Sequence, residues 1–386
     1  MTVTPVATAA VWTAKAVLPK AAAWYGQHDG AIALDGTGPV LVAGGADAAS
    51  AGLDLSAVFD PATGGWNPAG ALAAARRLHT LTLLNDGRVL ATGGLSGAAA
   101  GPGLRSAEIY DPAHHAWGPA DPMVTPRWGH AAALLPDGSV LVSGGTGTRS
   151  GTTTKALRSA ERFDPGTGKW HPADDMTDAR TRHTAVPLAG GRVLVVGGSA
   201  PVGTPDDPAL AFCELYDPAT GHWTPTGSLL RGRRHHQATP LSGTTVLVTG
   251  GTAPGASGDG PFDPFSQRTA ERYDLATGTW TAVRDMPSGR AFHRAVPFGA
   301  GKVLVVGGTA ADRDEAGYRS AIVYDTGTNI WTPLAGLGLG RWSLAAAALS
   351  EGRAVVAGGV VRSGLAAADP AVTELTDGSE LYGNQP

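Results

Sequence analysis

Seven runs of aliphatic and β-branched residues, each ended by a Gly-Gly pair, dominate the hydrophobic pattern of the chain. Each run is short and apolar throughout, which predicts a strand that is buried on both faces. The pairs recur at intervals of roughly fifty residues, and a period in this range indicates an array of repeated units. The runs are VLVAGG (40–45), VLATGG (89–94), VLVSGG (140–145), VLVVGG (193–198), VLVTGG (246–251), VLVVGG (303–308) and AVVAGG (354–359).

A second predicted strand follows each Gly-Gly pair after a loop of variable length. It ends in an aromatic residue and Asp, and a short turn then leads to a tryptophan, as in DPATGGW (60–66) and DPGTGKW (164–170). Asp-Pro favours a type I turn and glycine accepts the left-handed residue, so each turn predicts a hairpin. The strand ends are VFD (58–60), IYD (109–111), RFD (162–164), LYD (215–217), RYD (272–274) and VYD (323–325), with LYG (381–383) as a degenerate last copy.

This unit resembles the kelch repeat, whose signature is a double glycine, an aromatic residue farther on and a tryptophan after a short turn. The resemblance covers nearly the whole chain. It implies an all-β fold, a seven-bladed β-propeller with four-stranded antiparallel blades. Trp12 precedes the first repeat, and the chain reaches Tyr382 just before a tryptophan is due. We therefore expect the N-terminal strand to complete the last blade and close the ring, which removes a free sheet edge.

The repeat predicts one propeller domain over residues 1–386. The expected limits are about 22–70 for blade 1, 74–121 for blade 2, 125–174 for blade 3, 178–227 for blade 4, 231–284 for blade 5, 288–335 for blade 6 and 339–383 for the inner three strands of blade 7, whose outer strand is about 8–16.

Composition narrows the classes of partner and compartment. With 56 Gly, 28 Pro and 42% hydrophobic residues, the chain suits a turn-rich β-protein better than a disordered one. A net charge of -4 gives no bulk attraction to nucleic acid or to an anionic membrane. A single cysteine, Cys213, excludes an intrachain disulfide or a cysteine-cluster zinc site. Without a signal-peptide pattern or a long apolar run, we predict a monomeric cytoplasmic protein.

An Arg-x-x-His motif precedes five of the Gly-Gly strands. Because it recurs from blade to blade, we interpret its histidines as structural. A buried guanidinium needs a partner, and a glutamate two residues before the aromatic residue offers one within the same blade. The predicted pairs are Arg76–Glu108, Arg127–Glu161, Arg180–Glu214, Arg233–Glu271 and Arg341–Glu380. Blade 1 has neither residue, and Ile322 replaces the glutamate of blade 6, which leaves Arg290 without a carboxylate.

Residues that break the repeat are the candidates for function. We expect them at the mouth of the central channel, where one sector of the ring combines a cation, aromatic rings and polar groups. That combination suits an organic anion with an apolar body, although the same residues could simply fill space there. The candidate ligand contacts are Trp24, Tyr25, Trp128, Arg290, Phe292, Arg341, Trp342 and Ser343. The candidate catalytic residues are Tyr25, His28, His235, Asp259, Asp263 and Asp314, the last three from long loops.

Several other chemistries lack their motifs. The Gly-Gly pairs lack the features of a phosphate loop, and no nucleophile elbow occurs. Resemblance to kelch copper radical oxidases would require a cysteine cross-linked to a tyrosine, but Cys213 lies in a predicted buried strand. The iron motif of kelch specifier proteins is only partly matched by DDMTDARTRH (174–183), where His183 comes one place late.

Two functions of different classes remain. The first is binding of an anionic organic metabolite, with cofactor-independent acid–base chemistry of the isomerase, lyase or cyclase type; no cofactor or metal is expected. The alternative is a non-catalytic propeller that recognises a protein or peptide.

Overall fold

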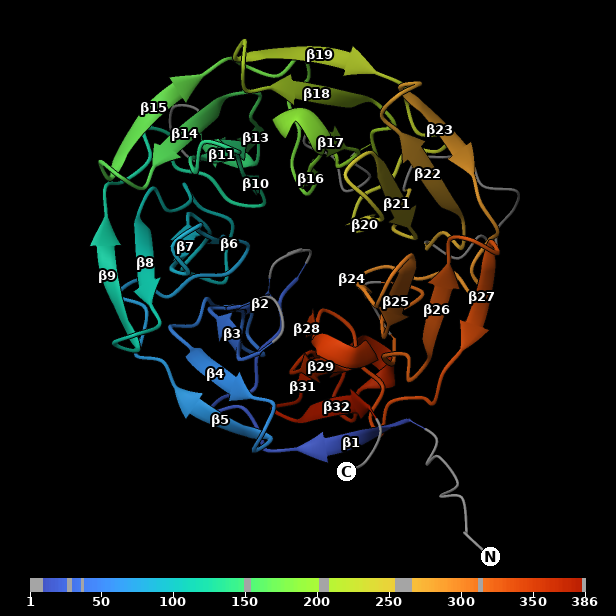
Figure 1. The fold of residues 1–386 in the computed structure, drawn as a ribbon. Coiled ribbons are helices and arrows are strands. Elements are labelled where there is room, and N and C mark those ends of the chain that lie inside the picture. The colour runs from blue at the N-terminus through green and yellow to red at the C-terminus, as the bar shows by residue number, and fades with distance from the viewer. Residues whose placement is uncertain are drawn as a thin grey trace, which may run out of the picture.

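Seven four-stranded antiparallel sheets stand around a common axis in the computed structural model (Figure 1). The structure describes residues 10–25, 30–35, 38–148, 154–200, 208–253, 266–311 and 315–383. The predicted all-β, seven-bladed propeller is therefore confirmed. Within the described ranges, no helix is long and apolar enough to cross a membrane.

The strands of each blade run outward from the axis in chain order. Blade 1 contains β2 (Ala31–Ala33), β3 (Val40–Ala43), β4 (Ser56–Asp60) and β5 (Gly65–Pro68). Blade 2 contains β6 (Thr80–Leu83), β7 (Val89–Thr92), β8 (Ala107–Asp111) and β9 (Ala116–Ala120). Blade 3 contains β10 (Ala131–Leu134), β11 (Val140–Ser143), β14 (Ala160–Asp164) and β15 (Lys169–Ala173). Blade 4 contains β16 (Thr184–Pro187), β17 (Val193–Val196), β18 (Cys213–Asp217) and β19 (His222–Thr226).

The remaining blades follow the same order until the ring closes. Blade 5 contains β20 (Gln237–Pro240), β21 (Thr245–Thr249), β22 (Ala270–Asp274) and β23 (Thr279–Ala282). Blade 6 contains β24 (Arg294–Pro297), β25 (Lys302–Val306), β26 (Ala321–Asp325) and β27 (Ile330–Pro333). Blade 7 contains β28 (Ala345–Ala348), β29 (Ala354–Ala357), β32 (Ser379–Gly383) and β1 (Val11–Lys15).

The N-terminal strand closes the ring as predicted. β1 pairs antiparallel with β32, and Trp12 lies opposite Tyr382 with ring centroids 5.3 Å apart. The same aromatic pair recurs in other blades, for example between Tyr216 and Trp223 at 5.0 Å. The first and last strands of the chain therefore share one sheet, and blade 7 has no unpaired outer edge on β32.

Buried second strands form the core of the propeller. In blade 4, all four residues of Val193–Val196 are buried, because neighbouring blades cover both faces of the sheet. Aliphatic side chains from adjacent blades therefore interdigitate all around the ring.

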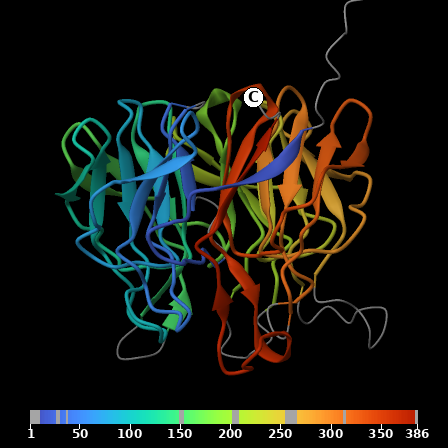
Figure 2. The same cartoon turned by 90° about the horizontal axis from the view of Figure 1, so that it is seen from below.

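The loops after the Gly-Gly pairs share one end of the propeller, which we call the loop face. Two additional hairpins extend from it, β12 (Thr146–Thr148) with β13 (Thr154–Ala156) from blade 3 and β30 (Val360–Arg362) with β31 (Glu374–Leu375) from blade 7 (Figure 2). Three short 3₁₀ turns complete the described secondary structure, namely η1 (Ala189–Gly191), η2 (Ser350–Gly352) and η3 (Gly364–Ala366).

Candidate functional site

The repeated arginines belong to the scaffold. All five predicted intra-blade ion pairs form: Arg76–Glu108 (2.6 Å), Arg127–Glu161 (2.8 Å), Arg180–Glu214 (3.1 Å), Arg233–Glu271 and Arg341–Glu380 (2.7 Å). Each guanidinium also donates to the carbonyl of the first glycine of the Gly-Gly pair in its own blade. Arg341, predicted as a ligand contact, is one of these buried pairs. Glu380 and backbone carbonyls accept its N–H groups, which argues for a structural role, and its ligand contact stays a prediction.

The repeated histidines also have structural contacts. His130 Nε2 lies 3.1 Å from the hydroxyl of Thr80, and His293 Nε2 lies 2.8 Å from that of Thr249, in each case on the preceding blade. Burial, reinforced by Arg127 and Arg76, lowers the pKa of His130 to about 3. This histidine is therefore neutral at physiological pH and joins blades 2 and 3.

Arg290 does not reach the mouth as a ligand clamp. Its side chain is 1% exposed, and its guanidinium donates to the carbonyl of Gly307 and to the hydroxyls of Ser288 and Ser320. The ring of Tyr318 lies 5.5 Å from the guanidinium carbon. As predicted, this arginine has no glutamate partner among the described residues. Its neutral acceptors and its burial argue against the role of ligand clamp, and the ligand contact stays a prediction.

A ring of seven equivalent residues surrounds the axis on the loop face, each two places after the repeated arginine position. We call it the mouth ring; its members are Trp24, Leu78, Gly129, Arg182, His235, Phe292 and Ser343. Backbone N–H groups of one blade donate to carbonyls of the preceding blade at Gly129→Leu78 (2.8 Å), Arg182→Gly129 (2.7 Å), Phe292→His235 (3.3 Å), Ser343→Phe292 (2.9 Å) and Trp24→Ser343 (2.7 Å). These bonds hold neighbouring members side by side around the mouth.

An aromatic cluster occupies one sector of the mouth. The rings of His235 and Phe292 stack with centroids 4.1 Å apart, and Phe292 lies 5.3 Å from Trp342. Tyr25 meets Trp342 edge-on at 5.7 Å and also packs against the neighbouring cluster that contains Trp128. The structure thus brings the predicted ligand contacts Tyr25, Trp128, Phe292 and Trp342 close to His235, a predicted catalytic residue. Their contact with a ligand stays a prediction.

Trp24 is a core residue rather than a mouth contact. Its side chain is completely buried, and its indole Nε1 donates to the carbonyl of Ala43 at 3.0 Å. The ring lies against Gly358, in the place that a histidine takes beside the corresponding glycine of other blades, such as His130 beside Gly93. The indole thus fills the junction of blades 7 and 1, which argues for a structural role, and its ligand contact stays a prediction.

The catalytic candidates are only partly placed. Burial raises the pKa of Tyr25 to about 12, so its phenol is protonated at neutral pH and can donate a hydrogen bond. The other candidates lie outside the described residues, apart from His235: they are His28, Asp259, Asp263 and Asp314.

Four arginines near the mouth were not among the predicted site residues. Arg77, Arg182 and Arg234 are partly exposed, and Arg294 is a buried residue at the start of the innermost strand β24. Arg294 Nη2 donates to the carbonyl of Trp24 at 3.0 Å, which places its charge just below the mouth ring. The sequence did contain a signal, since these arginines occur at repeat positions where other blades carry different residue types.

The described residues do not assemble the copper or iron sites that were considered from the sequence. Cys213 is buried, and burial raises the pKa of its thiol to about 11. In the iron-like motif, Asp174 contacts the exposed His222, whereas His183 is buried beside Ser143. Within the described ranges, no three His, Cys, Asp or Glu side chains are grouped to hold a metal ion.

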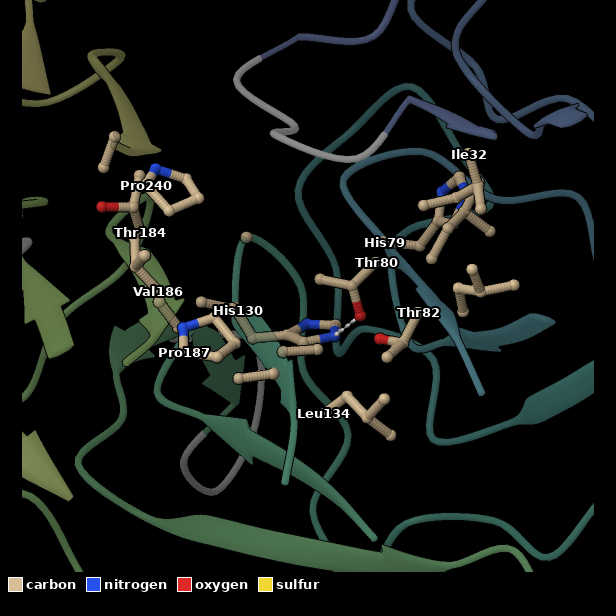
Figure 3. Close-up of a pocket in the computed structure, with 18 of the residues that line it drawn as sticks. Ile32, His79, Thr80, Thr82, His130, Leu134, Thr184, Val186, Pro187 and Pro240 are labelled. Atoms are coloured by element: carbon tan, nitrogen blue, oxygen red, sulfur yellow. Dashed lines mark hydrogen bonds between the residues drawn. The ribbon is translucent and has the colours of Figure 1, made fainter. Parts of the chain in front are cut away.

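A cavity of about 310 Å³ lies beside the axis, below the mouth ring (Figure 3). The innermost strands β6, β10 and β16 supply most of its wall, with Ile32 from blade 1 and Ala238 and Pro240 from blade 5. Its polar groups are threonine hydroxyls and the rings of His79 and His130.

Comparison with known proteins agrees with this architecture. The Kelch motif family model matches residues 127–177 and 290–338. The chain is 27% identical over 203 residues to Kelch-like protein 25 of Xenopus tropicalis, covering 52% of this chain and 32% of that one. It is 30% identical over 169 residues to Kelch-like protein terF of Aspergillus terreus, covering 43% of this chain and 35% of that one. The chain thus spans about a third of the length of these relatives, and it is a kelch-repeat β-propeller.

Solved structures show the same fold at low sequence identity. A structure titled "Structure of YjhT" superposes with a TM-score of 0.58 at 17% identity, covering 78% of this chain and 93% of that one. A fungal alcohol oxidase of the AA5 family, in complex with copper, gives a TM-score of 0.69 at 18% identity, covering 98% of this chain and 76% of that one. At these identities the likeness concerns the fold alone.

Proposed function

We propose that this propeller binds a small organic anion at the mouth on its loop face. The observation that carries the proposal is the aromatic cluster of His235, Phe292, Trp342 and Tyr25, set among partly exposed arginines such as Arg234. Guanidinium groups favour carboxylate or phosphate, and aromatic rings favour an apolar body. We assign the contact with the anionic group to Arg182 and Arg234 instead of Arg290, because Arg182 and Arg234 are partly exposed.

Buried polar atoms in the same sector add neutral hydrogen-bonding capacity. Trp342 Nε1, the Ser343 hydroxyl and the Thr309 hydroxyl have no hydrogen-bond partner in the part of the chain that the structure describes. A buried polar atom without a partner costs free energy, which a ligand group or a water molecule reaching it would recover. These atoms therefore favour a ligand with both an anionic group and neutral polar groups.

The catalytic form of the proposal is acid–base chemistry on that anion, as in an isomerase, lyase or cyclase. Tyr25 would act as the proton donor, because its phenol belongs to the same aromatic cluster and carries an O–H group. His235 is the candidate base, since it is the titratable ring stacked in the same cluster.

Protein recognition is the second candidate. The matched relatives are named Kelch-like proteins, and the segment that joins the two strands of the blade 7 hairpin carries exposed apolar side chains. Leu365 is 79% exposed and Val372 is 47% exposed. Exposed apolar residues on a projecting hairpin favour contact with another macromolecule.

The anion proposal can be tested with 8-anilino-1-naphthalenesulfonate, an aromatic sulfonate whose fluorescence reports binding. We expect saturable binding that weakens by about tenfold or more in Arg234→Ala, the usual effect of losing a charge-assisted hydrogen bond. Arg272→Ala, at an exposed arginine of β22, the third strand of blade 5, is the matched control and should bind like the unmodified protein. Equal binding by both variants would contradict the proposed site. Co-purification of a protein partner that depends on Leu365 would favour recognition instead.

A further inference from the structure

The cavity below the mouth ring differs in chemistry from the arginine-rich sector. Among the residues that the structure describes, its lining contains no Asp, Glu, Lys or Arg. The two histidines in its wall are neutral, because burial lowers the pKa of both His79 and His130. His130 is held by the hydroxyl of Thr80, as Figure 3 shows. Burying an unpaired charge in such surroundings is costly, so the wall disfavours ions and tolerates uncharged molecules.

Gly129 and Leu78 are the two members of the mouth ring that line this cavity. Gly129 has a positive φ of 61°, a conformation that often requires glycine. The propeller shows that it is not required here. Five equivalent residues adopt the same left-handed backbone with side chains: Leu78 (54°), Arg182 (55°), His235 (55°), Phe292 (54°) and Ser343 (50°).

Local packing gives only a weak reason for the glycine. A Cβ atom on Gly129 would meet the hydroxyl of Thr181 at 2.8 Å and the Cγ of Arg182 at 3.6 Å. The Thr181 hydroxyl donates to the Gly129 carbonyl at 3.1 Å, but it lies at the end of a rotatable side chain and can move. The main consequence of having glycine at this place is that no side chain covers this part of the cavity rim.

We infer that the cavity is a separate binding compartment for a compact, uncharged and largely apolar molecule, which enters past Gly129. The volume of about 310 Å³ is at the lower end of the usual range for small-molecule sites. Alanines line it at Ala132, Ala185 and Ala238, and their small side chains keep it open. The threonine hydroxyls allow one or two hydrogen bonds to the occupant. This compartment does not depend on the arginines of the proposed anion site.

N-phenyl-1-naphthylamine is a suitable probe, because it is the uncharged counterpart of the sulfonate used for the mouth. We expect saturable fluorescence enhancement with the unmodified protein and binding weakened by about tenfold or more in Gly129→Leu, whose side chain would cover the rim. Gly118→Leu is the matched control, since a Cβ at that outer-strand glycine meets nothing within 4 Å. It should bind the probe normally.

The two probes separate this inference from the proposed anion site. Arg234→Ala should leave binding of the uncharged probe unchanged while it weakens binding of the sulfonate. If Gly129→Leu fails to fold, as judged by its melting temperature, Ala132→Leu narrows the cavity from within and should weaken binding similarly. Absence of saturable binding by the unmodified protein, or unchanged binding in a folded Gly129→Leu or Ala132→Leu variant, would overturn the inference.

Discussion

Blades 4 and 6 bury the same repeated arginine in two different ways. In blade 4, Arg180 donates to Glu214 at 3.1 Å and to two backbone carbonyls. In blade 6, Arg290 has no carboxylate and donates to Ser288, Ser320 and backbone carbonyls. Burial lowers the pKa of Arg290 to about 10. A guanidinium can therefore be held inside this fold by a carboxylate or by neutral oxygens alone.

Blade 6 lacks the glutamate of the paired blades and also lacks a backbone N–H group that donates to that glutamate. Glu214 accepts a hydrogen bond of 2.8 Å from the backbone N–H of Thr177, and the glutamates of the other paired blades accept from the same position. In blade 6 that position is Pro287, which has no N–H, and Ile322 stands in place of the glutamate. The two replacements together remove the acceptor and this donor, which is how part of a buried polar network can be lost without a large penalty.

The largest effect is expected from breaking the pair in blade 4. Arg180→Ala leaves Glu214 buried without its cation, so the free energy of unfolding should fall by about 3–5 kcal/mol. Denaturant unfolding measures this loss. Adding Glu214→Ala should recover part of it, and strictly additive losses in the double-mutant cycle would show that the two side chains do not interact.

Converting blade 4 to the arrangement of blade 6 should have a smaller effect. Glu214→Ile leaves the buried guanidinium of Arg180 without its carboxylate and the N–H of Thr177 without its acceptor. It should cost about 3 kcal/mol, at the lower end for breaking a buried ion pair. Thr177→Pro in the same chain removes that donor and should restore about 1 kcal/mol, although each change alone is destabilising. Urea midpoints of the two single variants and the double variant test this. A double variant less stable than Glu214→Ile would show that the two replacements do not compensate each other.

Arg290→Ala should cost less than Arg180→Ala, because it orphans no carboxylate. It removes hydrogen bonds to Gly307 and the two serines, which predicts a loss of about 1–2 kcal/mol. Binding of the sulfonate probe at the mouth should stay unchanged, since the side chain is buried. Weakened binding in a variant of normal stability would restore Arg290 as a ligand contact.

Repetition explains what the sequence could and could not predict. The seven blades, ring closure and five ion pairs follow from residues that recur in register. Trp24 was misplaced because it lies one repeat position after Trp128 and Trp342: Ala23, not Trp24, makes the bridge that those two residues make. A shift of one place turns a side chain to the other side of an extended backbone. The neutral acceptors of Arg290 come from Ser288 and Ser320, and only the folded blade shows that both reach one guanidinium.

The smallest effect is expected from restoring a carboxylate to blade 6. Ile322 is buried and pairs with Val305 in the same register in which Glu271 of blade 5 pairs with Val248. Ile322→Glu would place a carboxylate at the position from which the other glutamates reach their arginine. The ion pair gained with Arg290 and the desolvation of the new charge oppose each other, so stability should change by less than about 1 kcal/mol.

Leu304→Glu is the control, because it buries a carboxylate on the adjoining strand β25 but on the opposite face of the sheet. It should destabilise blade 6 by several kcal/mol, about the cost of an unpaired buried charge, or prevent folding. Thermal melting of both variants decides the matter. If Ile322→Glu is as damaging as Leu304→Glu, then Arg290 cannot pair with a carboxylate, and blade 6 differs from blade 4 in the placement of its guanidinium as well as in its partners. A near-neutral Ile322→Glu would show that blade 6 keeps the geometry of the paired blades and lacks only the acid.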